Sequence, residues 1–165
     1  MKHLLAILFF VLPASSLPAA QPNIVFILAD DMGYGDLGCY GHPEAKTPVI
    51  DQLARDGVRF TQHYANGPEC SPTRTAFLTG RYQQRAGGLE CAIGTGNVGR
   101  YDDAIRLAKE RQLGLPAKQA VLPSALKQPG YASGVFGKWH LGYEPQFNPL
   151  EHGWDDFFGY MGGNV

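Results

Sequence analysis

Three short runs of apolar residues predict strands. Residues 23–29 form a continuous apolar run rich in β-branched side chains, which is typical of a strand buried on both faces of a parallel sheet. Residues 58–64 alternate loosely between apolar and polar side chains and predict a second strand. The run at residues 132–136 predicts a third strand, again buried.

Helices are predicted where a capping residue or an early proline precedes an apolar stripe and a glycine follows it. These signals delimit four helical segments, at residues 47–57, 70–80, 102–113 and 123–127. In the first segment Thr47 is the expected N-cap, and Ile50, Leu53 and Ala54 are the expected buried face. Residues 83–100 contain five glycines and predict a loop of the kind that borders functional sites.

The first 20 residues differ in pattern from the rest of the chain. Lys2 and His3 precede an unbroken apolar run at residues 4–12, and small residues follow it up to Ala20. This order is typical of a secretory signal peptide and predicts a periplasmic or secreted protein. A buried N-terminal helix is the alternative. The apolar run is too short for a transmembrane span, which takes about 20 residues.

Composition and charge narrow the class of protein. The chain of 165 residues has 14 Lys and Arg against 15 Asp and Glu, a formal net charge of −1. This balance argues against binding nucleic acid through a broad basic surface. The hydrophobic content of 44% and the charged content of 18% are typical of a soluble globular protein. Three cysteines leave one unpaired in an exported protein, and Cys39 and Cys91 are a candidate pair if Cys70 has another role.

A cysteine at the start of a predicted helix is the first candidate for chemistry. Cys70, Pro72 and Arg74 form a Cys-x-Pro-x-Arg pattern that places Cys70 at or near the N-cap. Free backbone N–H groups and the helix dipole favour negative charge at that position. Arg74 falls on the same helix face, within reach of the Cys70 side chain. The pattern indicates an anion site beside a nucleophile; the alternative is a buried structural cysteine and a surface arginine.

Two further groups of polar residues follow predicted strands. Asp30 and Asp31 come directly after the first strand, where α/β sheets place their ligands, and adjacent carboxylates suit a hard divalent cation. A turn with two solvated acids is the alternative. Lys138 and His140 follow the third strand and would point to one side of an extended segment. A lysine can bind an oxyanion and a histidine can move a proton, although the two also fit an ordinary surface pair.

Together these motifs resemble the type I sulfatases, a formylglycine-dependent family of the alkaline phosphatase superfamily. The resemblance lies in the segments at residues 30–36, 70–81 and 137–142. It implies the N-terminal part of an α/β fold with a largely parallel central sheet flanked by helices on both faces. Residues 21–165 would be a truncated catalytic domain that follows a signal peptide at residues 1–20. One departure is Glu69, where the family often has an apolar residue.

The resemblance also implies a role for each candidate residue in the hydrolysis of a sulfate monoester. A maturation enzyme would oxidise Cys70 to formylglycine (3-oxoalanine), whose hydrate attacks sulfur and which also contacts the cation. Asp30 and Asp31 would hold that cation, which is usually Ca²⁺ and less often Mg²⁺. Arg74 would stabilise formylglycine and the metal cluster, Lys138 would bind the sulfate group, and His140 would contact formylglycine and act as a base.

Members of the family are usually much longer than this chain. The resemblance implies two further metal ligands, another histidine and another lysine that have no match in this sequence. We therefore expect an N-terminal fragment of a sulfatase, inactive by itself, whose substrate is an aryl or carbohydrate sulfate. Two other interpretations stay open: a phosphate or phosphonate monoester hydrolase of the same superfamily, and a non-catalytic remnant that binds sulfated glycans.

Overall fold

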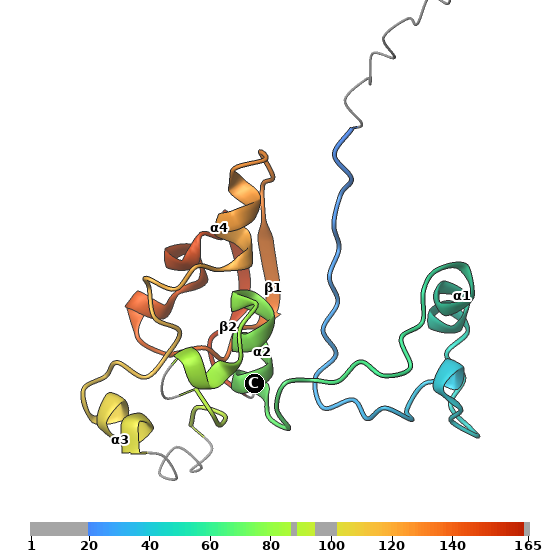
Figure 1. The fold of residues 1–165 in the computed structure, drawn as a ribbon, viewed down its shortest axis with the longest axis horizontal. Coiled ribbons are helices and arrows are strands. Elements are labelled where there is room, and N and C mark those ends of the chain that lie inside the picture. Colours follow the sequence, from blue (N-terminus) through green and yellow to red (C-terminus); the bar gives the residue numbers. More distant parts are fainter. Residues whose placement is uncertain (1–19, 87–88, 95–101, 164–165) are drawn as a thin grey trace, which may run out of the picture. The chain divides into compact units, whose positions relative to one another are not determined.

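The computed structural model describes residues 20–86, 89–94 and 102–163 (Figure 1). The chain divides into two units, Met1–Met32 and Gly33–Val165, and each is described by itself. The predicted signal peptide at residues 1–20 lies outside the described residues except for its last residue, Ala20. Within the described ranges, no helix has the length and apolar character needed to cross a membrane.

The described part of the first unit, residues 20–32, contains neither helix nor strand. The strand predicted at residues 23–29 is therefore wrong for this structure, and Val25 and Ile27 are each 84% exposed. A strand buried on both faces needs neighbouring strands for its backbone hydrogen bonds and helices to cover its faces. The described residues of this unit supply neither, so β propensity alone does not form a strand here.

The second unit begins with a 3-10 helix, η1 (Gly38–Tyr40), which contacts helix α1 (Pro48–Asp56). As predicted, Thr47 occupies the N-cap position of α1. Its hydroxyl does not cap the helix but accepts a hydrogen bond from Gly38 N–H (2.9 Å) and donates one to Asp51 Oδ1 (2.8 Å). The side chain of Thr47 therefore ties η1 to α1.

Two predictions for this part of the chain are wrong. Ile50 and Leu53 on α1 are 45% and 70% exposed instead of buried, and residues 58–64 form no strand. Both predictions assumed a neighbouring sheet. Among the described residues, however, the only two strands, β1 (Gly134–Lys138) and β2 (Asp156–Tyr160), pair with each other.

The two strands run parallel, as the sequence predicted for the sheet. Their register pairs Gly134 with Asp156 at one end and Lys138 with Tyr160 at the other. The strand predicted at residues 132–136 thus begins two residues later than expected, and the prediction that it is buried is wrong, because Phe136 is 74% exposed. Strand β2 was not predicted. The pairing continues past β1, because Trp139 N–H donates to the Tyr160 carbonyl (3.0 Å).

Helix α2 (Cys70–Thr79) begins and ends close to the predicted positions. Glu69 occupies its N-cap position, where an acidic side chain suits the helix dipole. Gly80 ends the helix with a φ of 63°, a left-handed conformation that glycine adopts without strain. Ser71 and Thr75 lie on its buried side, each with 0% exposure.

The described part of the second unit contains further helices. They are η2 (Gln83–Ala86), α3 (Asp102–Lys109), α4 (Leu122–Lys127), η4 (Pro145–Phe147) and η5 (Pro149–His152). The helix predicted at residues 102–113 ends early because Arg111 adopts a left-handed φ of 57°. The one predicted at residues 123–127 is confirmed to within one residue.

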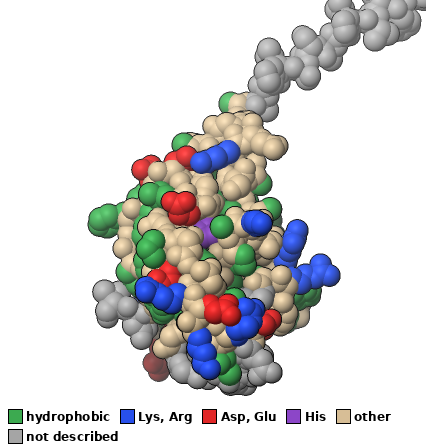
Figure 2. Space-filling model, turned by 90° about the vertical axis from the view of Figure 1, so that its left-hand side faces the viewer, with side chains coloured by type: hydrophobic (Ala, Val, Ile, Leu, Met, Phe, Trp, Pro, Cys, Tyr) green, Lys and Arg blue, Asp and Glu red, His purple; other side chains and the backbone are tan. Residues whose placement is uncertain are grey.

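Apolar side chains from several segments of the second unit form one core cluster. Leu89, Leu115 and Leu141 are fully buried in it, and Trp139 is 2% exposed. Trp139 and Leu141 flank His140 in sequence, so the segment after β1 is anchored on both sides. On the face shown in Figure 2, acidic and basic side chains are interspersed, which agrees with the balanced charge of the chain.

Candidate active site

The thiol of Cys70 and the ammonium group of Lys138 are in direct contact. Cys70 is the first residue of α2, and Lys138 is the last residue of β1. Lys138 Nζ donates a hydrogen bond to Cys70 Sγ over 3.0 Å, and both residues are half-buried. A helix N-terminus and a lysine both favour negative charge, so the fold places the thiol in electropositive surroundings.

Arg74 adds a second positive charge next to this contact. Its NH1 group donates a hydrogen bond of 2.7 Å to the backbone carbonyl of Lys138. Helix α2 therefore supplies both the thiol and a guanidinium that fixes the end of β1. The sequence predicted these three residues for one site, and the structure brings them together.

His140 lies two residues past β1 and is 1% exposed. Its φ of 55° is left-handed, and its backbone N–H donates to the Met161 carbonyl (3.1 Å). The extended segment predicted through Lys138 and His140 does not hold at His140, because its left-handed φ lies outside the extended region. The imidazole is buried, and its Nε2 lies 2.6 Å from the Ile93 carbonyl oxygen.

The loop that follows η2 also contacts the site; the sequence predicted a loop near a site here but assigned it no residue. Ala92 N–H donates to Glu69 Oε2 (2.5 Å), and Ile93 N–H donates to Ser71 Oγ (3.2 Å). The residues on either side of Cys70 in sequence therefore hold two consecutive peptides of this loop. The glycines in this region predicted a loop near a site, but the hydrogen-bond partners depend on the tertiary structure and leave no sequence signal.

The predicted cation ligands, Asp30 and Asp31, lie near the end of the first unit. Both residues are exposed, and Asp31 has a left-handed φ of 55°. Two adjacent carboxylates offer hard oxygen ligands, so this donor set fits Ca²⁺ or Mg²⁺. In the described part of the first unit, these are the residues suited to hold a divalent cation.

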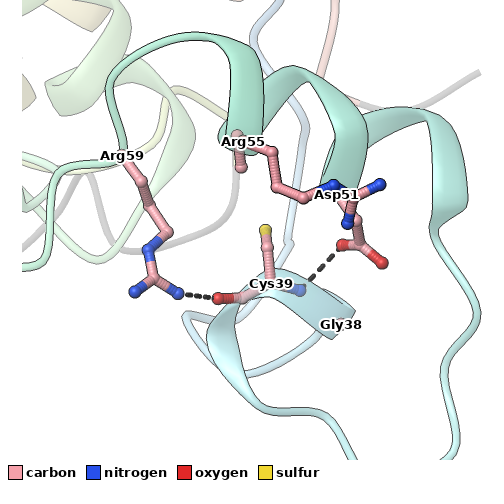
Figure 3. Close-up of a pocket in the computed structure, with 6 residues that line it drawn as sticks. Gly38, Cys39, Asp51, Arg55 and Arg59 are labelled. Atoms are coloured by element: carbon pink, nitrogen blue, oxygen red, sulfur yellow. Dashed lines mark hydrogen bonds between the residues drawn. The ribbon is translucent and has the colours of Figure 1, made fainter.

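A pocket in the second unit lies between η1 and α1 and contains none of the predicted site residues (Figure 3). It is lined by Gly38, Cys39, Asp51, Ala54, Arg55 and Arg59. Cys39 N–H donates to Asp51 Oδ1 (2.7 Å), and Arg59 donates to the Cys39 carbonyl. The pKa of the Asp51 carboxyl is lowered from its usual value, mainly by the hydrogen bond that it accepts from the Thr47 hydroxyl. These contacts join η1 to α1 and give the polar groups of the pocket a structural role.

The cysteines form no disulfide within the described residues, so the candidate pair of Cys39 and Cys91 is not joined in this structure. Cys39 is half-buried and Cys91 is buried. The thiol of Cys70 likewise forms no disulfide, which leaves its sulfur to the contact with Lys138.

The chain is similar to known sulfatases in sequence. A family model described as sulfatase matches residues 22–164. The dog (Canis lupus familiaris) N-acetylgalactosamine-6-sulfatase is 44% identical over 156 residues, which cover 92% of this chain and 28% of that protein. The mouse (Mus musculus) steryl-sulfatase is 44% identical over 160 residues, covering 93% of this chain and 24% of that protein. The chain thus spans about a quarter of the length of these relatives.

The fold of this chain is also similar to that of solved structures. The crystal structure of Ps i-CgsB superposes with a TM-score of 0.69 and 35% identity, covering 83% of this chain and 27% of that one. A protein from glycosaminoglycan metabolism of Bacteroides thetaiotaomicron superposes with a TM-score of 0.69 and 37% identity, covering 85% and 28%. The predicted α/β fold of the alkaline-phosphatase-like type is confirmed, and the chain belongs to the sulfatase family.

Proposed function

We propose that this chain carries part of the active site of an enzyme that hydrolyses sulfate monoesters through a formylglycine made from Cys70. The observation that supports this most directly is the 3.0 Å contact between Lys138 Nζ and Cys70 Sγ at the N-terminus of α2. Sγ stands where an oxygen would be attached to Cβ after conversion. A lysine at that position faces the nucleophile and the sulfate group that it attacks.

The charges around Cys70 suit a sulfate ester. The substrate is an anion, so attack at sulfur needs positive groups that are fixed before the reaction begins. Lys138 provides a compact ammonium group that binds sulfate oxygens. Arg74 holds the backbone of Lys138 through the 2.7 Å hydrogen bond and adds positive charge beside the nucleophile. Hydrated formylglycine, once formed, supplies the attacking hydroxyl.

His140 is proposed as the base of the second half of the reaction. It receives a proton from the remaining hydroxyl at position 70 when sulfate leaves and the aldehyde returns. Its burial and its hydrogen bond to the Ile93 carbonyl orient the ring before the reaction. An oriented neutral imidazole is suited to accept a proton near neutral pH.

Asp30 and Asp31 are proposed to hold a divalent cation, Ca²⁺ in preference to Mg²⁺, which residue 70 also contacts after conversion. The cation supplies Lewis-acid chemistry at the sulfate oxygens when it is bound. Flexible carboxylate ligands that need no strict octahedral geometry favour Ca²⁺. We further propose that the protein is exported by the segment at residues 1–20 and depends on a maturation enzyme for the conversion of Cys70.

A sulfate ester is the proposed substrate. The relatives are named N-acetylgalactosamine-6-sulfatase, steryl-sulfatase and arylsulfatase D, and Ps i-CgsB has also been solved in complex with a neocarrahexaose. These names include carbohydrate, steroid and aryl sulfates. We propose a carbohydrate sulfate or an aryl sulfate for this protein.

The test is turnover of an aryl sulfate and an aryl phosphate by the full-length protein purified from its own host. We expect the sulfate to be hydrolysed faster, and Cys70→Ala to abolish the activity because it removes the formylglycine precursor. Cys39→Ala is the matched control, since Cys39 is also half-buried but lies in the pocket between η1 and α1. Faster turnover of the phosphate, or sulfatase activity that survives Cys70→Ala, would contradict the proposal.

A further inference from the structure

A closed ring of hydrogen bonds joins Ser71, Ile93 and His140 beside the proposed nucleophile. The Ser71 hydroxyl accepts from Ile93 N–H (3.2 Å) and donates to the backbone carbonyl of His140 (2.8 Å). The ring closes between His140 Nε2 and the Ile93 carbonyl oxygen, 2.6 Å apart. The exposed fractions of Ser71, Ile93 and His140 are 0%, 4% and 1%, so water does not compete for these contacts.

This ring fixes which nitrogen of the imidazole carries the proton. A carbonyl oxygen is only an acceptor, so Nε2 must donate in its contact with Ile93. A neutral imidazole has one N–H group, and the proton-accepting lone pair therefore lies on Nδ1. The hydrogen bond that Nε2 donates thus determines that Nδ1 is the nitrogen able to accept a proton.

Neighbouring residues leave the imidazole of His140 little freedom to rotate. The backbone of Gly163 lies against the imidazole so closely that a Cβ atom there would be 2.6 Å from His140 Cε1. Tyr143 also donates its hydroxyl to the Ile93 carbonyl (3.1 Å). The orientation of the imidazole thus depends on the position of the Ile93 peptide. The Ser71 hydroxyl holds that peptide by accepting a hydrogen bond from Ile93 N–H.

We propose that Ser71 is a positioning residue, which holds His140 through the Ile93 peptide as the Nε2–H tautomer with Nδ1 as the proton acceptor. This inference rests on the proposed function and assigns its proton-transfer step to one atom. Ser71 follows Cys70 directly, so one turn of α2 carries the nucleophile precursor and the group that orients the base. Ser71 takes no part in bond making or breaking.

Kinetics of the full-length enzyme test the positioning role. In Ser71→Ala, we expect kcat for an aryl sulfate to fall by about 10- to 100-fold, because a misplaced base loses its alignment. We expect KM to stay within about threefold, since Ser71 does not contact the sulfate group. Rates are divided by the converted fraction of residue 70, measured by mass spectrometry, because the substitution lies next to the conversion site.

Thr75→Val is the matched control, because Thr75 is on the same helix with 0% exposure and its hydroxyl forms no hydrogen bond with the residues that the structure describes. It removes a buried hydroxyl outside the ring, so kcat should stay within about twofold of wild type. Equal kcat losses in Ser71→Ala and Thr75→Val would overturn the proposal. A normal kcat in Ser71→Ala would do the same.

A spectroscopic measurement tests the tautomer without using activity. Nitrogen-15 spectra of the full-length protein with labelled histidine should show His140 protonated on Nε2 at neutral pH, with its signal assigned by its loss in His140→Asn. In Ser71→Ala that signal should shift toward a mixture of tautomers. A wild-type His140 protonated on Nδ1 would refute the inference. If the converted enzyme showed no sulfatase turnover, the proposed function would fail, while the spectrum would still decide the tautomer.

Discussion

The contact between Lys138 and Cys70 gives the most direct prediction about activity. Replacing Lys138 by Met keeps most of the length and apolar volume of the side chain but removes the ammonium group. Lys138 Nζ lies 3.0 Å from Cys70 Sγ, and the guanidinium of Arg74 binds the backbone carbonyl of Lys138, not its side chain. The substitution therefore removes the charge at the nucleophile and leaves the link between α2 and β1 in place.

The expected loss follows from the strength of a charge-assisted hydrogen bond. Such a bond contributes about 1.5–3 kcal/mol. At 1.36 kcal/mol for each factor of ten, that range corresponds to a decrease of roughly 10- to 150-fold in kcat/KM. Lys138 is only half-buried, and solvent screening reduces the effect of its charge. We therefore expect the lower half of this range.

The assay is steady-state hydrolysis of an aryl sulfate by the full-length protein, with rates corrected for the converted fraction of residue 70. Lys127→Met is the control, because Lys127 is 48% exposed and forms a surface ion pair with Asp155 (3.2 Å). Surface pairs of this kind contribute little, so the control should retain wild-type kcat/KM. A folded, fully converted Lys138→Met enzyme with kcat/KM within about twofold of wild type would refute the assigned role.

Three further predictions concern the cation, the core and the response to pH. Asp30→Asn should weaken calcium binding, measured by isothermal titration calorimetry, by at least about tenfold, whereas the exposed Asp36→Asn should not change it; equal affinities would contradict the assigned ligand. Leu115→Ala should destabilise the fold by about 2–5 kcal/mol because Leu115 is fully buried, and the half-exposed Leu150→Ala should cost far less in a denaturant melt. Burial lowers the pKa of His152 below its usual 6.5, so the unfolded chain binds more protons and stability falls as the pH drops below 6.5. The decrease in Tm from pH 7 to pH 5 should therefore be smaller in His152→Leu, and an unchanged decrease would show that His152 does not cause it.

Local signals in the sequence were sufficient for helices α1, α2 and α4 and for part of the site. Capping residues and terminal glycines located α1, α2 and α4 to within one or two residues, because helix ends are set by nearby groups. The Cys-x-Pro-x-Arg pattern placed Cys70 at the start of α2 for the same reason.

Strands were predicted less well because their formation depends on partners far away in sequence. Residues 23–29 and 58–64 have the composition of strands but remain outside the described sheet. Strand β2 was missed because its five residues include an acid and a glycine, which weaken the pattern. Strand β2 forms because its backbone pairs with β1, although its composition alone does not predict a strand.

The hydrogen-bonded ring around His140 illustrates the same limit for the site. Residue types suggested that His140 and Lys138 act together, but Ser71 and the Ile93 peptide gave no signal of their own. Ser71 and His140 are 69 positions apart, and the hydrogen bond between them forms only in the tertiary structure. Side chains that orient a base are found from tertiary structure, whereas the nucleophile and its motif are readable in the sequence.

The central claim is that residue 70 becomes formylglycine in an active sulfatase. The mass of the tryptic peptide at residues 60–74, taken from full-length protein purified out of its own host, tests this claim most directly. We predict a mass in which the sulfur of Cys70 is replaced by a carbonyl oxygen, in a preparation that hydrolyses an aryl sulfate. An unmodified cysteine throughout a preparation with full sulfatase activity would contradict the account.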